Sequence, residues 1–385
     1  MPSLIRAAAV LAAVPALVFA QATSQPVTSS AGPIKVETLA SLEFPWAVAA
    51  LPDGRLLITE KPGRLRIFAN GQLSAPVEGT PKTSYRERKA EQGGLLDVAV
   101  DPNFSQNHRI YLSFSEEAEK QSPDQKEIDD PRFGGNLDLN DYLLVGGAIA
   151  RGTLEGNTLK DVQVIWRQRP KTIGRGHFGN RMSVASDGSI YVTSGDRMRF
   201  DPAQDPNSNL GKVVRIDPSG KEEIWSSGHR NILAIAAGHG QLWALEMGPL
   251  GGDELNLVEK GKNYGWPVVS DGDNYDKSVI PDHKTKPEFQ APAKTWTPVI
   301  SPSGAMFYDG DMFPWKGDLI VGGLSSQAII RLTLDGGKVK NEERVNMGRR
   351  VRDVMQAADG AIIAVTDDKN GELLRLSPSS KATRQ

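Results

Sequence analysis

One histidine of the chain stands among glycines, where the backbone can bring its side chain into a cavity. His177 lies between Gly176 and Gly179, and the residues that follow alternate as a strand, an Asp-Gly turn and a second strand. A neutral imidazole so placed can take a proton near neutral pH. A solvated loop histidine has the same local sequence, so the residues alone leave both interpretations open.

The segment around His177 also spells G-x-G-x-x-G from Gly174 to Gly179. In a dinucleotide-binding fingerprint these glycines open a helix. Here they precede a strand, so we reject that interpretation. The other four histidines lack the spacing of a zinc site such as H-E-x-x-H, and we expect structural roles for them.

An irregular acidic run, Met247–Asn256, is a candidate cation site. It contains Gly248 and Pro249, followed by Asp253 and Glu254. Calcium binds carbonyl and carboxylate oxygens together. An acidic turn in contact with water has the same composition, so both interpretations stay open. A second run, 271–276, begins like an EF-hand loop but lacks the acid at its fifth position and the glycine at its sixth, and we exclude it.

Several arginines precede expected strands. Arg230 stands beside Asn231, and Arg349, Arg350 and Arg352 precede the last apolar repeat. Arg350 and Arg352 are two residues apart, so on a strand both point to one face. Forked guanidinium donors suit a multiply anionic ligand. Solvated surface arginines are the alternative.

Composition excludes several classes of function. The 385 residues carry 45 Lys plus Arg against 47 Asp plus Glu, a formal charge of -2, without the basic excess that nucleic-acid binding needs. There is no cysteine, which excludes disulfides, thiolate metal sites and thiol catalysis. The 39 glycines and 25 prolines favour short strands joined by tight turns.

The N-terminal segment predicts export. Arg6 precedes the apolar stretch Ala7–Ala20, so we interpret residues 1–20 as a signal peptide, with the periplasm as the destination. No apolar run is long enough to predict a membrane span. We expect a flexible leader over 21–33, a single domain over 34–378 and a tail over 379–385.

One phrase of strand, tight turn and strand recurs six times, which predicts an all-β, six-bladed β-propeller of four-stranded antiparallel sheets. A sandwich with similar turns is the alternative, but it gives no reason for one repeated internal order. Residues 115–142 interrupt the series with an acidic insertion, which we expect to be a surface loop. The six repeats are Trp46–Phe68, Leu95–Phe114, Met182–Ile216, Ile232–Leu245, Ser303–Leu334 and Val351–Leu376.

Taken together, these motifs resemble the soluble glucose/sorbosone dehydrogenase family, in particular the periplasmic aldose sugar dehydrogenases that use pyrroloquinoline quinone (PQQ). The resemblance implies a six-bladed propeller with PQQ and a calcium ion on its axis. The phrases that carry it are Phe44–Ala47, Gln92–Asp97, Gly176–Arg181, Gly228–Asn231, Gly248–Asn256, Asn263–Pro267 and Arg350–Val354.

The resemblance also implies roles for individual residues. His177 is the general base that takes the C1 hydroxyl proton of the sugar while hydride passes to C5 of the quinone, and Asp196 orients it. The residues that match contacts to PQQ are Gln92, His177, Arg230, Asn231, Arg350 and Arg352. The residues that match calcium ligands are Gly248 and Pro249, through their main-chain oxygens, and, at a second structural site, Glu254 with the Tyr264 carbonyl.

The chain departs from the family pattern at one cofactor contact. Where the family commonly has a lysine after Gly-Ala-Leu, this chain has Gly322-Gly323-Leu324-Ser325. One cationic contact is therefore lost, unless Arg349 or a loop residue replaces it.

The principal hypothesis is an enzyme that oxidises aldoses to lactones and passes electrons to a quinone, a cytochrome or a dye, as a monomer or dimer. The alternatives are a calcium-dependent, lactonase-like propeller hydrolase and a non-catalytic propeller that binds a sugar or a protein.

Overall fold

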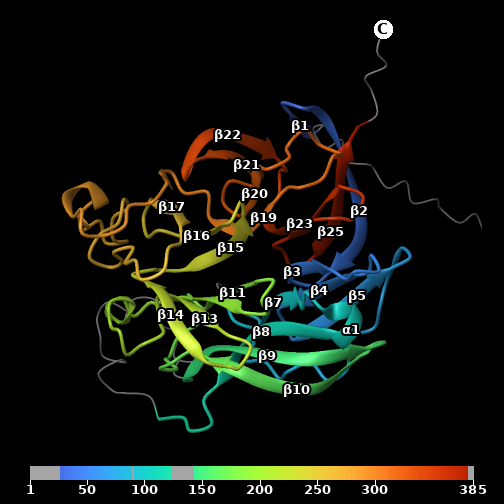
Figure 1. The fold of residues 1–385 in the computed structure, drawn as a ribbon, viewed down its shortest axis with the longest axis horizontal. Helices are drawn as coiled ribbons and strands as arrows, with labels where there is room; N and C mark the ends of the chain where they lie inside the picture. The colour runs from blue at the N-terminus through green and yellow to red at the C-terminus, as the bar shows by residue number, and fades with distance from the viewer. Residues whose placement is uncertain (1–26, 89–90, 123–142, 380–385) are drawn as a thin grey trace, which may run out of the picture.

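The computed structural model describes residues 27–88, 91–122 and 143–379, whose strands form six antiparallel sheets around a common centre (Figure 1). The first sheet holds β3 (Pro45–Ala50), β4 (Leu56–Glu60), β5 (Arg64–Ala69) and β6 (Gln72–Leu73). The second holds β7 (Leu95–Val100), β8 (Arg109–Glu117), β9 (Val145–Glu155) and β10 (Thr158–Arg167). The third holds β11 (Gly179–Val184), β12 (Ile190–Ser194), β13 (Lys212–Ile216) and β14 (Glu222–Ser227).

The fourth sheet holds β15 (Ile232–Gly238), β16 (Gln241–Glu246), β17 (Asp253–Leu257) and β18 (Lys294–Trp296). The fifth holds β19 (Pro302–Phe307), β20 (Leu319–Gly323), β21 (Ala328–Asp335) and β22 (Lys338–Asn346). The sixth holds β23 (Val351–Gln356), β24 (Ile362–Thr366), β25 (Gly371–Pro378), β2 (Gly32–Leu42) and β1 (Val27–Ser29). The helical turns are α1 (Phe104–Asn107) and the 3₁₀ turns η2 (Asp201–Ala203) and η3 (His283–Thr285).

The first strand of each sheet lies next to the first strand of the following sheet. Contacts run from β3 to β7, β11, β15, β19 and β23, and β23 returns to β3. This closed ring confirms the predicted six-bladed propeller.

The ring is closed by pairing the two ends of the described chain. β2 pairs antiparallel with β25, with Val36 opposite Leu376, and β1 pairs with β2. The expectation of a flexible leader over 21–33 is therefore wrong from Val27 onward. Local sequence could not reveal this because the partner of β2 lies more than 300 residues away. The predicted signal peptide, 1–20, lies outside the described residues.

The predicted insertion also begins later than expected. Ser115–Glu117 belong to β8, where Glu117 pairs with Val145 of β9. Their acidic character does not break the strand, because Glu116 is bound by Arg167 at 2.7 Å and by Lys171 at 2.5 Å. Residues 123–142 lie outside the described part of the chain.

The predicted Asp-Gly turns connect the first and second strands of three blades. In the turn between β3 and β4, Gly54 adopts φ +86°, a conformation that favours glycine. The carboxylate of Asp53 accepts a hydrogen bond from the Arg55 backbone N–H at 3.1 Å. The turn thus follows from a local side-chain acceptor and a glycine.

Hydrophobic side chains fill the spaces between neighbouring blades. Trp46 and Leu57 of the first blade pack in one buried cluster with Leu95 and Leu112 of the second. Buried polar side chains also connect inner strands, as where the Asp353 carboxylate accepts a hydrogen bond from the Val48 N–H at 2.9 Å. These contacts join neighbouring blades around the axis.

None of the helices in the described part of the chain has the length and apolar character needed to cross a bilayer.

Candidate active site

His177 and Asp196 meet at one end of the hairpin formed by β11 and β12. Gly179, at the start of β11, is paired with Ser194, at the end of β12, so the residues just outside both strands are neighbours. The Nδ1 atom of His177 lies 2.7 Å from Oδ1 of Asp196. Because a carboxylate only accepts hydrogen bonds, Nδ1 carries the proton and Nε2 is left with a lone pair.

Two further contacts hold the backbone of this pair. His177 has φ +51°, and its N–H donates to Oε1 of Gln92 at 2.9 Å. Gly195 lies against the His177 carbonyl so closely that a Cβ there would come within 2.1 Å of its oxygen. The predicted cofactor residue Gln92 is therefore in direct contact with the predicted base.

The environment favours a neutral histidine and an ionised aspartate. Burial lowers the pKa of His177, and the positive charge of Arg230 lowers it further. Burial alone would raise the pKa of Asp196, but His177 and Arg230 outweigh it, so the pKa lies below its ordinary value. His177 is 7% exposed, so the pair works in a largely dry environment. This is the protonation state that a general base needs.

The indole of Trp266 is a second partner of Asp196. Its Nε1 donates to Oδ2 at 2.8 Å, so both carboxylate oxygens are fixed. Trp266 comes from the segment between β17 and β18, and its ring stacks on Phe200 with centroids 5.5 Å apart. The sequence phrase Asn263–Pro267 contained this tryptophan, but nothing in the local pattern indicated its contact with the aspartate.

Arg230 and Asn231 lie between β14 and β15, with unused hydrogen-bonding atoms. Both residues are buried, and the carbonyl of Arg230 accepts the Asp196 N–H at 2.8 Å. Among the described residues, neither Nε of Arg230 nor Oδ1 of Asn231 has a hydrogen-bond partner. Unpaired buried polar atoms are costly, which is evidence for a ligand that satisfies them.

Arg350 and Arg352 share one carboxylate, as the prediction of a common face requires. Asp367, which follows β24, accepts hydrogen bonds from Arg350 at 2.6 Å and from Arg352 at 2.7 Å. Burial raises the pKa of Asp367, but the two guanidinium groups outweigh burial and hold it well below its ordinary value. One carboxylate for two arginines leaves positive charge at this place.

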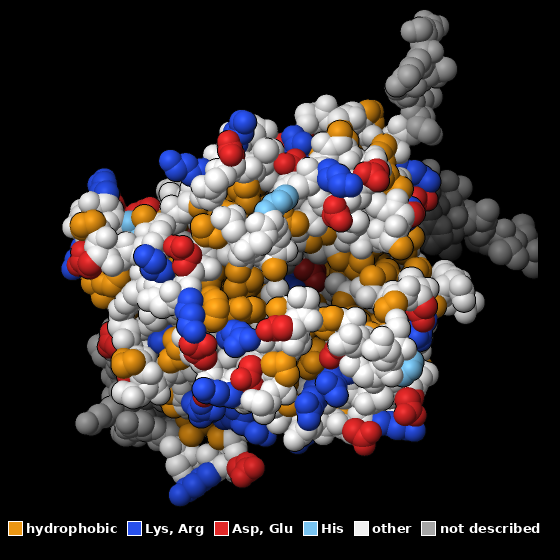
Figure 2. Space-filling model, in the orientation of Figure 1, with side chains coloured by type: hydrophobic (Ala, Val, Ile, Leu, Met, Phe, Trp, Pro, Cys, Tyr) orange, Lys and Arg blue, Asp and Glu red, His pale blue; other side chains and the backbone are white. Residues whose placement is uncertain are grey.

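A cavity of about 550 Å³ brings several of these groups together. This axial cavity has a size typical of small-molecule sites. Figure 2 shows that one face of the molecule is hollowed near its centre, with hydrophobic side chains bordering the hollow. The predicted residues in its wall are Gln92, Arg350 and Arg352, and Phe178 and Gly179 beside His177 also line it.

The four predicted metal ligands line a second, smaller cavity of about 10 Å³, together with Arg230 and Trp266. In this structure the carbonyl oxygens of Gly248 and Tyr264 already accept hydrogen bonds from side chains. Nη1 of Arg230 donates to the Gly248 carbonyl at 2.8 Å. The guanidinium therefore competes with a cation at Gly248, through its positive charge and by using one lone pair of this oxygen.

The predicted second calcium site is filled by a histidine. Nε2 of His283 donates to the Tyr264 carbonyl at 3.0 Å, and Nδ1 lies 3.4 Å from Asp271 and 4.0 Å from Glu254. Burial opposes protonation of His283, but the hydrogen bond to Asp271 and the charge of Glu254 outweigh it and raise its pKa. With Nε2 on the Tyr264 carbonyl and Nδ1 beside Glu254, the imidazole occupies the place that a calcium ion would need.

Two charged residues of the axial region carry roles that sequence reasoning missed. Lys61, just after β4, lines the axial cavity. Arg181, on β11, is buried between Asp97 at 3.1 Å and Asp353 at 3.2 Å. Each of these acids comes from a different inner strand, and no repeat pattern signals which side chains will face one another across the axis.

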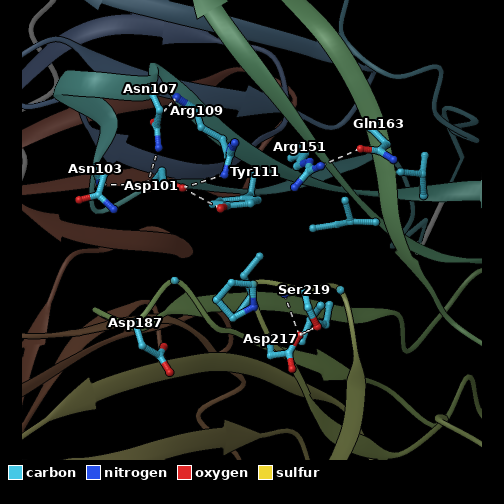
Figure 3. Close-up of a pocket in the computed structure, with 17 residues that line it drawn as sticks. Asp101, Asn103, Asn107, Arg109, Tyr111, Arg151, Gln163, Asp187, Asp217 and Ser219 are labelled. Carbon is cyan, nitrogen blue, oxygen red and sulfur yellow. Dashed lines mark hydrogen bonds and ion pairs between the residues drawn. The ribbon is translucent and has the colours of Figure 1, made fainter.

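A further cavity of about 440 Å³ lies between the second and third blades and contains none of the predicted site residues (Figure 3). Its carboxylates serve local structure. Asp101 binds the Tyr111 hydroxyl at 2.8 Å and the Asn107 amide at 3.0 Å. Asp217 accepts hydrogen bonds from Ser219 in its own turn. We assign this cavity no part in the site.

Comparison with known proteins places nearly all of the propeller in one family. The family model described as Glucose / Sorbosone dehydrogenase matches residues 42–375. The aldose sugar dehydrogenase YliI of Escherichia coli (strain K12) is 35% identical over 371 residues, covering 90% of this chain and 93% of that protein.

Two solved structures superpose on the chain. The apo-form of the soluble aldose sugar dehydrogenase from Escherichia coli has a TM-score of 0.78 at 34% identity, covering 90% of this chain and 100% of that one. The PQQ-bound form of an aldose sugar dehydrogenase from Streptomyces coelicolor has a TM-score of 0.68 at 23% identity, covering 92% of this chain and 99% of that one. At that identity the second likeness supports the shared fold alone.

Proposed function

We propose that this chain, which belongs to the glucose/sorbosone dehydrogenase family, oxidises aldose sugars at C1 to lactones with PQQ and calcium as cofactors. Membership makes the chain an oxidoreductase with a sugar as its substrate. The observation that carries the finer proposal is the 2.7 Å contact between His177 Nδ1 and Asp196, located beside a cationic cavity.

His177 acts as the base in this proposal. Its Nε2 takes the proton of the C1 hydroxyl, while the hydrogen on C1 leaves with its electron pair, so the sugar loses two electrons and becomes a lactone. Bound PQQ supplies the two-electron acceptor for that hydride. Asp196 holds Nδ1–H and stabilises the imidazolium that forms, as the third member of a catalytic triad does for its histidine. Trp266 holds the Asp196 carboxylate and Gln92 holds the His177 backbone, so the two side chains stay in contact.

The cationic groups of the cavity suit a tricarboxylate. Arg350 and Arg352 offer forked donors beyond those used by Asp367. Arg230 lines the second, smaller cavity and has an unpartnered Nε among the described residues. Guanidinium groups bind carboxylates through paired hydrogen bonds. We assign these three residues, with Gln92 and Asn231, to cofactor binding.

We propose a calcium ion only at the carbonyls of Gly248 and Pro249. Arg230 donates to the Gly248 oxygen in this structure, so calcium binding is favoured when the guanidinium turns to the carboxylates of the cofactor. Calcium and cofactor should therefore bind together. Calorimetry with calcium alone should give weak binding, and prior addition of PQQ should strengthen it. Equally tight calcium binding without PQQ would contradict this assignment.

We propose that the chain is exported to the periplasm and delivers electrons to a quinone, cytochrome or dye. The hydrolase alternative has less support. A metal-bound nucleophile on a propeller axis needs several convergent side-chain ligands, and the described residues contain no group of three or more His, Asp or Glu that could hold a metal.

The test is reconstitution of the purified chain. PQQ with calcium should give dye reduction with aldoses, and omission of PQQ or treatment with EDTA should abolish it. His177→Ala should bind PQQ but reduce no dye. Hydrolysis of a lactone without PQQ would support the hydrolase instead, and sugar affinity with no PQQ binding would support a binding protein.

A further inference from the structure

Lys61 is a buried lysine whose ammonium group is incompletely satisfied. It is 9% exposed and lines the axial cavity. Within the described residues its Nζ makes one hydrogen bond, to the Glu91 carbonyl at 3.0 Å, and lies 5.1 Å from the centre of the Phe44 ring. An ammonium has three donors. Among the described residues, the other two donors have no acceptor within hydrogen-bond distance.

Another buried lysine of the same protein shows what a purely structural role looks like. Lys212 is 1% exposed, and its Nζ donates to three carbonyls, those of Pro202 at 2.7 Å, Ala203 at 2.9 Å and Leu210 at 2.8 Å. All three donors are used, as burial demands. Lys61 is also buried, but its Nζ makes one hydrogen bond where that of Lys212 makes three.

The charge around Lys61 is unbalanced in the direction that an anion would correct. The cavity wall carries four cations, Lys61, Arg88, Arg350 and Arg352, against two carboxylates, Glu91 and Asp367. Both acids are engaged, since Glu91 binds Arg88 at 2.8 Å and Asp367 binds the other two arginines. Burial lowers the pKa of Lys61, the charges of Arg352 and Arg350 lower it further, and the carboxylates of Asp367 and Glu91 act in the opposite direction.

Arg349, the residue next to these arginines, does not replace the lysine that the family commonly has at the position of Ser325. Its guanidinium pairs with Glu372, and it is not part of the cavity wall. Ser325 itself is exposed, and its hydroxyl donates to the Val299 carbonyl at 3.1 Å. Leu324, one residue earlier, does line the cavity that Lys61 lines. Arg88 is paired with Glu91, and Arg350 and Arg352 are already assigned to the cofactor, so Lys61 is the cation of this wall that has no ion pair among the described residues.

We propose that Lys61 binds a carboxylate of PQQ and replaces the cationic contact that the chain lacks at Ser325. This assignment rests on the proposed function. Because Lys61 also donates to the carbonyl of Glu91, next to Gln92, it joins the cofactor to the segment that holds the His177 backbone.

The test compares PQQ affinity of three variants by calorimetry in the presence of calcium. Lys61→Gln keeps a donor for the Glu91 carbonyl but removes the charge, and should weaken PQQ binding by about 10- to 100-fold, the loss expected for one charge-assisted hydrogen bond. Lys61→Arg keeps the charge and should stay within about 3-fold of the wild type, less than the loss of one such bond. Lys212→Gln is the matched buried control, and should lower the melting temperature without changing PQQ affinity.

The salt dependence of PQQ binding tests the charge of Lys61 separately from any effect of the substitution on folding. The PQQ affinity of the wild type should fall more steeply with salt than that of Lys61→Gln, because one ionic contact is missing in the variant. Unchanged affinity in Lys61→Gln, or an equal loss in Lys61→Gln and Lys61→Arg, would overturn the assignment of Lys61 alone. A wild-type chain that binds no PQQ would overturn the proposed function and this assignment together.

Discussion

Asp196 holds Nδ1 of His177 at 2.7 Å, which directs the basic Nε2 of the ring away from the carboxylate. Its other oxygen is held by Trp266, so the carboxylate cannot rotate freely. A proton acceptor, a fixed orienting acid and an adjacent cationic cavity together form a site for removing a proton from a bound alcohol.

Replacing Asp196 should damage catalysis more than folding. Asp196→Asn removes the negative charge that supports the imidazolium while keeping the size of the side chain. We expect kcat to fall by about 10²- to 10⁴-fold, the range for loss of general-base assistance or of its orienting acid. Steady-state dye reduction at saturating PQQ measures it. A loss of less than about 3-fold would remove Asp196 from the mechanism.

The pH dependence of kcat/KM should show the lowered pKa of His177. The base works only when neutral, so activity should rise with pH through a pKa below the ordinary histidine value of 6.5 and be level at neutral pH. The charge of Asp196 raises the pKa of His177, so Asp196→Asn should move this limb to lower pH. An acid limb centred above pH 7 would contradict the account.

Arg181 should be a major contributor to stability. Its guanidinium neutralises Asp97 and Asp353, which are buried on two different inner strands. Burial already raises the pKa of Asp97 to about 6, despite the arginine. Arg181→Met leaves two buried carboxylates uncompensated, and should lower the free energy of unfolding by about 3–5 kcal/mol.

The matched control for Arg181 is the exposed pair of Arg55 and Asp53, 2.8 Å apart. Arg55→Met should change the free energy of unfolding by about 0–1 kcal/mol in the same denaturant titration. Equal effects of the two substitutions would show that the cluster of Arg181, Asp97 and Asp353 contributes no more to stability than an exposed ion pair.

Asp367 should make stability depend on acid pH. Its pKa is lowered in the folded state, so it contributes stability above the unfolded value of 3.8 and loses that contribution as the pH falls through the folded value. Asp367→Asn should therefore be less stable than the wild type at pH 7, with a smaller difference at pH 3. Urea unfolding at the two pH values measures both, and a difference that does not shrink at pH 3 would contradict the assignment.

The sequence predicted the blades because each depends on local signals, such as the Asp53-Gly54 turn between two apolar strands. It could not predict the pairing of β2 with β25, which depends on where the ring closes. His177 was found from its glycines, whereas Asp196 came from a family resemblance. The hairpin register that joins Gly179 to Ser194 was the physical signal available for that pair.

Contacts across the axis were beyond prediction for a related reason. Lys61 and Arg352 lie nearly 300 residues apart and line one cavity only because their blades are neighbours in the closed ring. The histidine at the expected second calcium site was also not predictable from the sequence. A carboxylate and a carbonyl predict a cation, but the sequence does not say that His283 supplies the charge.

The most direct test of the central claim is a single turnover of the PQQ- and calcium-loaded protein, mixed anaerobically with glucose and with glucose deuterated at C1. We predict loss of the oxidised cofactor spectrum with one equivalent of lactone formed, slower for the deuterated sugar, and no change within the same time for His177→Ala. An unaltered spectrum with the wild type, or a rate indifferent to His177, would contradict base-assisted oxidation at C1.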